Sequence, residues 1–195
     1  MTRAPVRRGA ARRTELLDAL VELLLAEGFV AFTLDDLAAR LHCSKRTLYA
    51  LAGSKEQLVR AAVVHFFRAS TAAVEEAIAE VSDPAVRIAT YLSAVAAALR
   101  PASAAFIDDV AAFAPAAEVY ERNTQAAARR IRSFVDEGVA AGAFRDVHTG
   151  FVADVVASTM VRIQQRQVAA ATGLSDADAY TELAALVTTG LLPDR

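Results

Sequence analysis

A short run of cationic, hydroxyl and phenolic side chains lies in the first third of the chain, comprising Ser44, Lys45, Arg46, Thr47 and Tyr49. Lysine and arginine pair with phosphate oxygens or guanine edges, threonine offers a hydroxyl and a methyl group, and a tyrosine hydroxyl often reaches a phosphate. The apolar positions of this run are spaced as on one face of a helix, so the polar side chains would point outward. The pattern predicts a helix that contacts DNA, and a solvated helix face is the alternative.

Neighbouring residues are suited to hold phosphates at helix N-termini. Thr33, which is followed three residues later by Asp36, is a typical N-cap residue. Lys55 falls in the first turn of a later expected helix, where a cation opposes the helix dipole unless an anion binds beside it. Upstream, we expect the arginine-rich residues 1–13 to contact phosphates or the minor groove through Arg7, Arg8 and Arg13, with a solubilising tail as the alternative.

The distribution of charge supports an anionic partner for the N-terminal part alone. The whole chain has a net charge of −2. Residues 1–60 contain 10 Lys and Arg against 7 Asp and Glu, whereas residues 61–195 contain 11 against 16. A basic N-terminal part on an acidic remainder restricts nucleic-acid contact to the N-terminal part.

Helices must position these groups, because the chain is rich in helix formers and poor in helix breakers. Alanine accounts for 46 of the 195 residues, against 8 glycines and 5 prolines. Apolar periodicity and capping residues predict an all-α fold of about nine helices. The expected ranges are 11–27, 34–41, 45–51, 54–81, 84–99, 103–114, 115–142, 149–171 and 175–191. Two short helices joined by a three-residue turn, behind a longer first helix, form a helix-turn-helix.

Other chemistries are poorly supported. The single cysteine, Cys43, excludes an internal disulfide and a cysteine-based zinc site, and a buried inert thiol or a redox switch remain its two readings. The adjacent His42 and Cys43 lack a third group to orient them for catalysis. Asp108 and Asp109 point about 100° apart on a helix, which favours an exposed face over half of a metal or acid–base site. We therefore expect no catalytic residue, metal site or cofactor.

Membrane insertion is not expected either. The longest run without a charged residue has 12 residues, whereas a membrane-spanning helix needs about 20. The apolar stretch that follows the basic N-terminus carries acidic residues, unlike a signal peptide. We expect a cytoplasmic protein.

Residues 14–67 resemble the DNA-binding part of the tetracycline-repressor (TetR) family. The matching residues are Gly28, Thr33, Leu34, Leu37, Ala38, Leu41, Ser44, Thr47, Leu48, Tyr49, Gly53, Ser54, Lys55, Glu56 and Leu58. Family members usually have glycine and a small aliphatic residue where this chain has His42 and Cys43, and an aromatic residue at Leu51. The resemblance implies a two-domain, all-α homodimer in which a small molecule changes the spacing of two DNA-binding parts.

The resemblance also implies an effector pocket in the C-terminal helices. The candidates are Phe66, Phe67, Tyr91, Phe106, Phe113, Tyr120, Phe134 and Gln165, for each of which core packing is the alternative. A lining of alanine and phenylalanine favours an apolar or weakly polar effector. The resemblance further implies that the dimer forms through residues 149–171 and 175–191, and the near absence of charge beyond Tyr180 in the latter helix supports this.

The sequence thus predicts three regions and one function. Residues 1–10 form a disordered basic arm, residues 11–54 a helix-turn-helix DNA-binding domain, and residues 55–195 a ligand-binding and dimerisation domain. The expected function is a ligand-responsive transcriptional regulator, most simply a repressor, that binds a near-palindromic operator as a dimer. A constitutive or architectural DNA-binding protein without an effector is the alternative.

Overall fold

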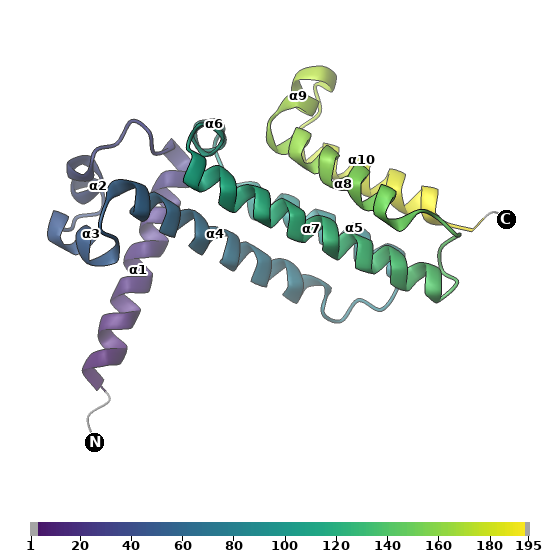
Figure 1. Cartoon of the computed structure of the whole chain (residues 1–195), viewed down its shortest axis with the longest axis horizontal. Coiled ribbons are helices and arrows are strands. Elements are labelled where there is room, and N and C mark those ends of the chain that lie inside the picture. Colours follow the sequence, from purple (N-terminus) through teal and green to yellow (C-terminus); the bar gives the residue numbers. More distant parts are fainter. Residues whose placement is uncertain (1–3, 194–195) are drawn as a thin grey trace. The chain divides into compact units, whose positions relative to one another are not determined.

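The computed structural model describes residues 4–193, with side chains from residue 12 onward. Within this range the chain is built of helices and contains no strand, which confirms the expected all-α fold (Figure 1). The helices are α1 (Ala4–Glu27), α2 (Leu34–Arg40), α3 (Lys45–Leu51), α4 (Lys55–Ile78), α5 (Pro84–Leu99), α6 (Ala104–Ala112), α7 (Ala114–Ala140), α8 (Thr149–Gln164), α9 (Gln167–Thr172) and α10 (Asp176–Leu191).

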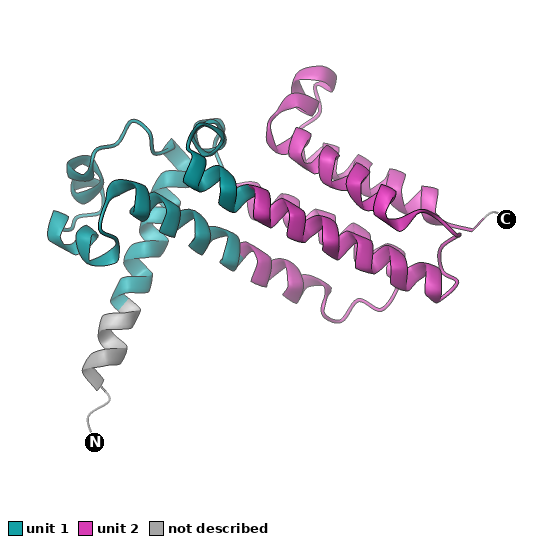
Figure 2. Cartoon of the chain, in the orientation of Figure 1, with its two compact units in different colours: residues 1–69, 101–120 teal, residues 70–100, 121–195 magenta. Residues whose placement is uncertain are grey.

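The helices form two compact units (Figure 2). Unit 1 comprises residues 1–69 and 101–120, and unit 2 comprises residues 70–100 and 121–195. Unit 1 therefore takes α6 from the second half of the chain to complete the packing of α1. The functional division expected between residues 54 and 55 stays a prediction, because compactness does not report on function.

Capping bonds define the two short helices of unit 1. Thr33 caps α2 by accepting a hydrogen bond from the amide of Asp36, whose side chain in turn accepts from the backbone of Thr33. Ser44 caps α3 by accepting from the amide of Thr47. An isolated helix of seven residues is marginal in water, so these caps and the packing of α2 on α3 maintain both helices.

Unit 2 has an apolar core formed by long helices. α10 packs against α5 and α8, and Ile88, Leu92, Ile131, Phe134 and Val156 are at most 1% exposed. Among the described residues the buried set contains no charged or strongly polar residue. The hydrophobic effect therefore supplies the main stabilisation of this unit.

Two expectations about helix boundaries are wrong. The single helix expected over 149–171 is broken between α8 and α9, because Arg166 adopts a left-handed conformation (φ 60°). The guanidinium of Arg166 pairs at 2.9 Å with Asp176 in the first turn of α10. At the other end, α1 begins at Ala4 rather than Ala11, since alanine and arginine favour helix and proline is tolerated in a first turn. Residues 1–3 of the expected arm lie outside the described residues.

Membrane-spanning potential is low within the described residues. No single helix there is both long enough and apolar enough to cross a bilayer, and α5 and α6 pass that test only when they are taken together across their connection.

Candidate nucleic-acid interface

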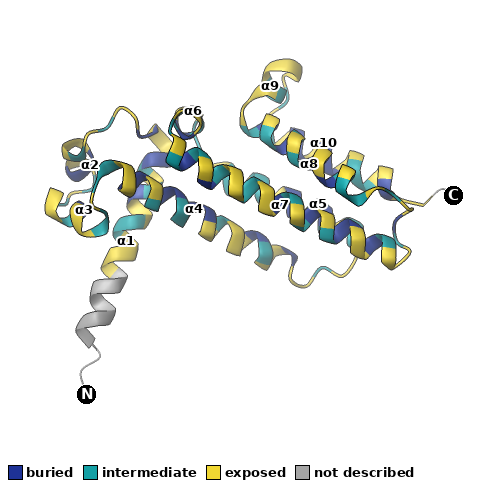
Figure 3. Cartoon of the chain, in the orientation of Figure 1, coloured by how far each residue is buried: buried dark blue, intermediate teal, exposed yellow. Residues whose placement is uncertain are grey.

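α3 turns the polar side chains identified in the sequence toward solvent (Figure 3). Leu48 is 1% exposed and anchors the helix, whereas the side chains of Lys45, Arg46 and Tyr49 are exposed, Tyr49 by 52%. Arg46 makes no hydrogen bond or ion pair with any other described residue, so its guanidinium is available to a ligand. The outward face of α3 thus offers two cations and a phenol at helical spacing.

The side chains at the start of α3 are already positioned by neighbours. The hydroxyl groups of Ser44 and Thr47 share a hydrogen bond of 2.8 Å. The ammonium group of Lys45 lies 2.6 Å from the carboxylate of Asp35 on α2. Both partners of this ion pair are largely exposed, so the pair is weak and a phosphate can exchange for the carboxylate.

Thr33 belongs to a tight capping arrangement. Its hydroxyl donates to the Oδ2 atom of Asp36 at 2.6 Å while accepting from the Asp36 amide at 3.2 Å. The hydrogen bond from the Thr33 side chain lowers the pKa of Asp36, with a further contribution from the Thr33 amide. The acid is therefore charged at neutral pH and favours the positive end of the α2 dipole.

Two other predicted DNA contacts already have protein partners. The ammonium group of Lys55 donates to the carbonyl of Val30 at 3.1 Å. The guanidinium of Arg13 donates to the carbonyls of Ala50 and Leu51, at 3.5 and 3.1 Å, and so caps the C-terminal end of α3. The side chains of Arg7 and Arg8 lie outside the described ones.

The turn between α2 and α3 shows how the chain accommodates its unusual residues. His42 adopts φ 49°, a left-handed conformation in which glycine is more common. The amides of His42 and Cys43 donate to the carbonyls of Ala39 and Ala38, at 3.2 and 2.9 Å, which closes the turn. Burial raises the pKa of the Cys43 thiol. A thiol that stays protonated is a poor nucleophile, which favours the inert reading over the redox switch.

The eight candidate pocket residues are divided between the two units. Unit 1 contains Phe66, Phe67, Phe106, Phe113 and Tyr120, and unit 2 contains Tyr91, Phe134 and Gln165. In unit 1 the rings form a continuous series of contacts, with centroid separations of 5.1 Å for Phe66–Phe67, 6.1 Å for Phe66–Phe106 and 5.7 Å for Phe67–Tyr120.

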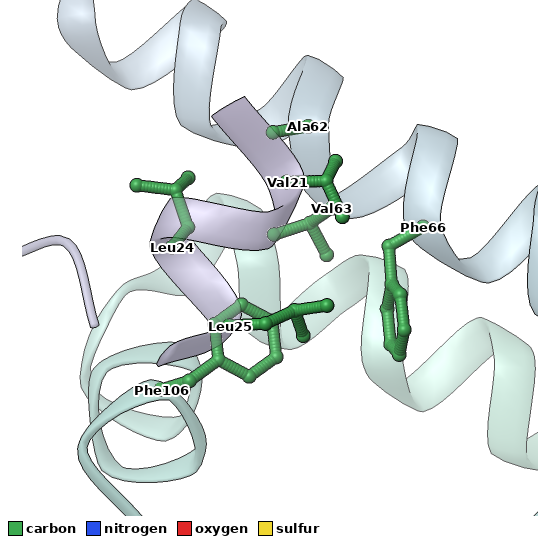
Figure 4. Close-up of a pocket in the computed structure, with 7 residues that line it drawn as sticks. All are labelled: Val21, Leu24, Leu25, Ala62, Val63, Phe66 and Phe106. Atoms are coloured by element: carbon green, nitrogen blue, oxygen red, sulfur yellow. The ribbon is translucent and has the colours of Figure 1, made fainter. Parts of the chain in front are cut away.

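A narrow apolar gap, with no room for a water-sized sphere, lies beside these rings (Figure 4). It is lined by Val21, Leu24 and Leu25 of α1, Ala62, Val63 and Phe66 of α4, and Phe106 of α6. Ligand pockets usually measure about 300–1,000 Å³, so this gap holds no small molecule in the conformation described.

Sequence reasoning missed one ring of this series. Phe29, which is 2% exposed, packs edge-on against Phe106 and Phe113 with centroid separations of 6.2 and 5.8 Å. Its position directly after the helix-ending Gly28 was the available signal, because an apolar residue just beyond a helix C-terminus often packs back on the domain.

In unit 2 the candidates belong to a packed core and to the surface. Tyr91 and Phe134 stack edge to face at 5.5 Å, and the guanidinium of Arg130 lies 4.6 Å from the Phe134 ring centre. Gln165 is exposed at the end of α8. Its neighbour Gln164 donates at 2.9 Å to the buried hydroxyl of Tyr180.

Comparison with known families identifies the part of the chain described above. Residues 16–62 match the family model described as bacterial regulatory proteins, tetR family. This range begins within α1, contains all of α2 and α3, and ends within α4.

Two curated proteins are similar to part of this chain. The chain is 57% identical over 44 residues to YvaF of Bacillus subtilis, named as an uncharacterized HTH-type transcriptional regulator. It is 36% identical over 58 residues to the DNA-binding transcriptional repressor TetR of Mycobacteroides abscessus. The alignments cover 23% and 30% of this chain and the same shares of the two relatives' own lengths.

The likeness of fold extends over nearly the whole chain. A TetR transcription regulator from Haloarcula marismortui superposes with a TM-score of 0.80, covering 94% of this chain and 100% of that protein. The sequence identity is 14%, so this comparison bears on the fold.

Proposed function

We propose that this chain, which belongs to the tetR family of bacterial regulatory proteins through residues 16–62, represses transcription by binding a near-palindromic operator as a homodimer. The exposed face of α3, with Arg46 unpaired among the described residues and Tyr49 beside it, carries this proposal. A helix of this kind enters the major groove, where arginine pairs with guanine and phosphates fix the register.

The neighbouring caps support the same assignment. The N-termini of α2 and α3 are capped by the hydroxyl groups of Thr33 and Ser44, both exposed, and helix N-termini attract phosphates. Lys45 and Lys55 have carbonyl or carboxylate partners in the free protein, and each can exchange that partner for a phosphate. The proposal therefore includes a modest rearrangement of lysine side chains on DNA binding.

Dimerisation is proposed through α8 and α10, both of which contain exposed positions (Figure 3) and carry apolar side chains at some of them. Phe151 and Val155 lie one turn apart on α8 and are 66% and 42% exposed, and Leu186 on α10 is 71% exposed. A second copy of the same face would cover these side chains and bring two α3 helices to one operator. Substitution of either Phe151 or Leu186 by glutamate is expected to give a monomer in analytical ultracentrifugation.

The response to an effector is proposed from the aromatic series of unit 1. Its rings and the adjacent gap are apolar, which suits an apolar or weakly polar molecule. Because the gap is small, binding requires that the surrounding helices move, and such movement is how a ligand shifts a regulator between states. A ligand that prefers the non-binding state about ten- to hundredfold supplies about 1.4–2.7 kcal/mol of coupling per site.

The test is a fluorescence-anisotropy titration of the protein with DNA from upstream of its own coding region, with a scrambled duplex of equal length as control. We expect at least a hundredfold preference for the native duplex and a steep loss of affinity with salt. Equal affinity for the two duplexes would instead favour the architectural DNA-binding protein, and absence of binding to both would refute the proposal.

A pair of variants assigns the contact to α3. Arg46→Ala should weaken operator binding by about 1–3 kcal/mol, because a base or phosphate contact is lost without disturbing the fold. Arg129→Ala removes the same charge from an exposed position on α7 and should leave affinity within about twofold. Equal effects of the two changes would show that total charge, rather than the face of α3, governs binding.

A further inference from the structure

The paired carboxylates of α6 have different surroundings. Asp108 is exposed, whereas Asp109 is partly buried and faces the segment that leaves α1. The Oδ2 atom of Asp109 accepts hydrogen bonds from the backbone amides of Phe29 at 2.5 Å and Val30 at 2.8 Å. These amides lie beyond the end of α1 and continue none of its backbone hydrogen bonds, so the carboxylate serves as their acceptor.

The same segment binds α6 through a second polar contact and a ring. The amide of Ser103, which caps α6, donates to the carbonyl of Leu25 in the last turn of α1 at 2.8 Å. The buried ring of Phe29 packs edge-on against Phe106 and Phe113. The loop donates hydrogen bonds to α6, and the cap of α6 donates one to α1. Together with the aromatic contact, these bonds fix the start of the α1–α2 loop on α6.

Gly28 provides the space for this arrangement. Its φ of 77° is a conformation that side chains rarely adopt. A Cβ atom at this position would also lie 2.6 Å from the Asp109 carboxylate and 3.3 Å from the backbone of Ala105. The glycine is thus required by both the turn and the close approach of the acid.

The far side of the loop leads directly into the proposed DNA-binding helices. The Val30 carbonyl accepts from Lys55 at the start of α4, and Thr33 caps α2 three residues later. α2 packs on α3. A bond that fixes Phe29 and Val30 therefore limits where α2 and α3 can lie within unit 1.

We infer that Asp109 is a positioning residue for DNA binding, acting through the loop of residues 28–33, and this inference rests on the proposed function. When only a fraction of the molecules has this loop in the position that allows DNA binding, the apparent dissociation constant for operator DNA equals the intrinsic constant divided by that fraction. The carboxylate accepts two amide bonds with one charged oxygen, and charge-assisted bonds of this kind are the stronger ones.

The test combines operator affinity with amide hydrogen exchange measured by NMR. Asp109→Ala should weaken operator binding about tenfold or more and speed exchange at Phe29 and Val30 by a similar factor. Asp108→Ala is the matched control and should change neither. Asp109→Asn should retain affinity within about threefold of the unmodified protein, because the amide oxygen still accepts both bonds.

If Asp109→Ala does not fold, amide hydrogen exchange measured in the unmodified protein still tests the inference. The amides of Phe29 and Val30 must then be protected well beyond the rates of an open loop. Unprotected exchange at both amides, or an Asp109→Ala protein that folds and binds operator normally, would overturn the inference. Failure of the unmodified protein to discriminate operator from scrambled DNA would instead refute the proposed function, whatever the exchange rates.

Discussion

In unit 1 the hydroxyl side chains that cap α2 and α3 are held by partners three residues away in the chain, as in the pairs Thr33–Asp36 and Ser44–Thr47. In unit 2 the ion pairs around the core join residues that are 50 and 55 positions apart, as in Arg87–Glu137 and Arg130–Glu75. The first kind of contact is a property of a short sequence, whereas the second exists after long helices have packed. A functional face can therefore be identified from sequence where its positioning contacts are local.

The largest expected effect on stability comes from removing an aromatic ring that lies in the core. Phe134 in unit 2 is 1% exposed and has Arg130 over its ring at 4.6 Å. Phe134→Ala should lower the free energy of unfolding by about 3–5 kcal/mol, because it leaves a cavity and removes aromatic and cation–π contacts. Urea unfolding followed by circular dichroism measures this loss.

Phe32 in unit 1 is the matched control, since it also has an arginine near its ring, Arg40 at 5.7 Å, but is not buried. Phe32→Ala should cost about 1 kcal/mol or less. If both substitutions lowered the free energy of unfolding by a similar amount, burial of the ring would not be what sets the cost of removing it.

Alkaline pH should act mainly on unit 2. Burial raises the pKa of Tyr91 to about 12, with the carboxylate of Glu75 contributing in the same direction. Because this value lies above the ordinary pKa of about 10, the stability contribution is complete below pH 10 and is lost as the pH rises toward 12. The difference corresponds to about 2–3 kcal/mol.

Tyr91→Phe should flatten the dependence of unfolding free energy on pH between 10 and 12, as measured by urea titrations at several pH values. Tyr49→Phe, at the exposed face of α3, is the control and should leave that dependence unchanged. Burial also raises the pKa of Tyr180, so some alkaline sensitivity is expected to remain in the Tyr91 variant. An unaltered slope in Tyr91→Phe would argue against burial of its hydroxyl.

Much of the secondary structure could be predicted from the sequence, and the reasons are local. The bounds of α3 and the caps Thr33 and Ser44 follow from residue types within one turn. The break between α8 and α9 could not be predicted, because the ion-pair partner of Arg166, Asp176, lies beyond α9 at the start of α10. An arginine in a left-handed conformation has no signature in the residues beside it.

In the candidate site too, the parts that could be predicted are those fixed by contacts local in the sequence. The exposed face of α3 was predictable because apolar spacing places Leu48 inward. The distribution of candidate pocket aromatics over two units was not predictable, because each ring is placed by contacts between distant segments, as with Phe67 and Tyr120. The bonds of Asp109 to residues 79 and 80 positions earlier belong to this second kind, although they lie in unit 1.

The smallest expected change in stability concerns the local cap itself. Thr33→Ala should lower the free energy of unfolding by about 1 kcal/mol, whereas Thr33→Ser keeps the hydroxyl and should cost much less. The hydrogen bond from Thr33 is the main cause of the lowered pKa of Asp36. Its contribution is complete above the ordinary pKa, near 4, and is lost as the pH falls through the lower value of the folded state.

Urea unfolding near pH 6 and near pH 3 therefore tests the cap in two ways. The alanine variant should differ from the unmodified protein more at pH 6 than at pH 3, because acid removes the charge of Asp36 that the hydroxyl favours. The serine variant should follow the unmodified protein at both values. A constant difference between alanine and threonine would mean that the cap acts through the Asp36 amide alone, and the local carboxylate bond would then contribute little to unit 1.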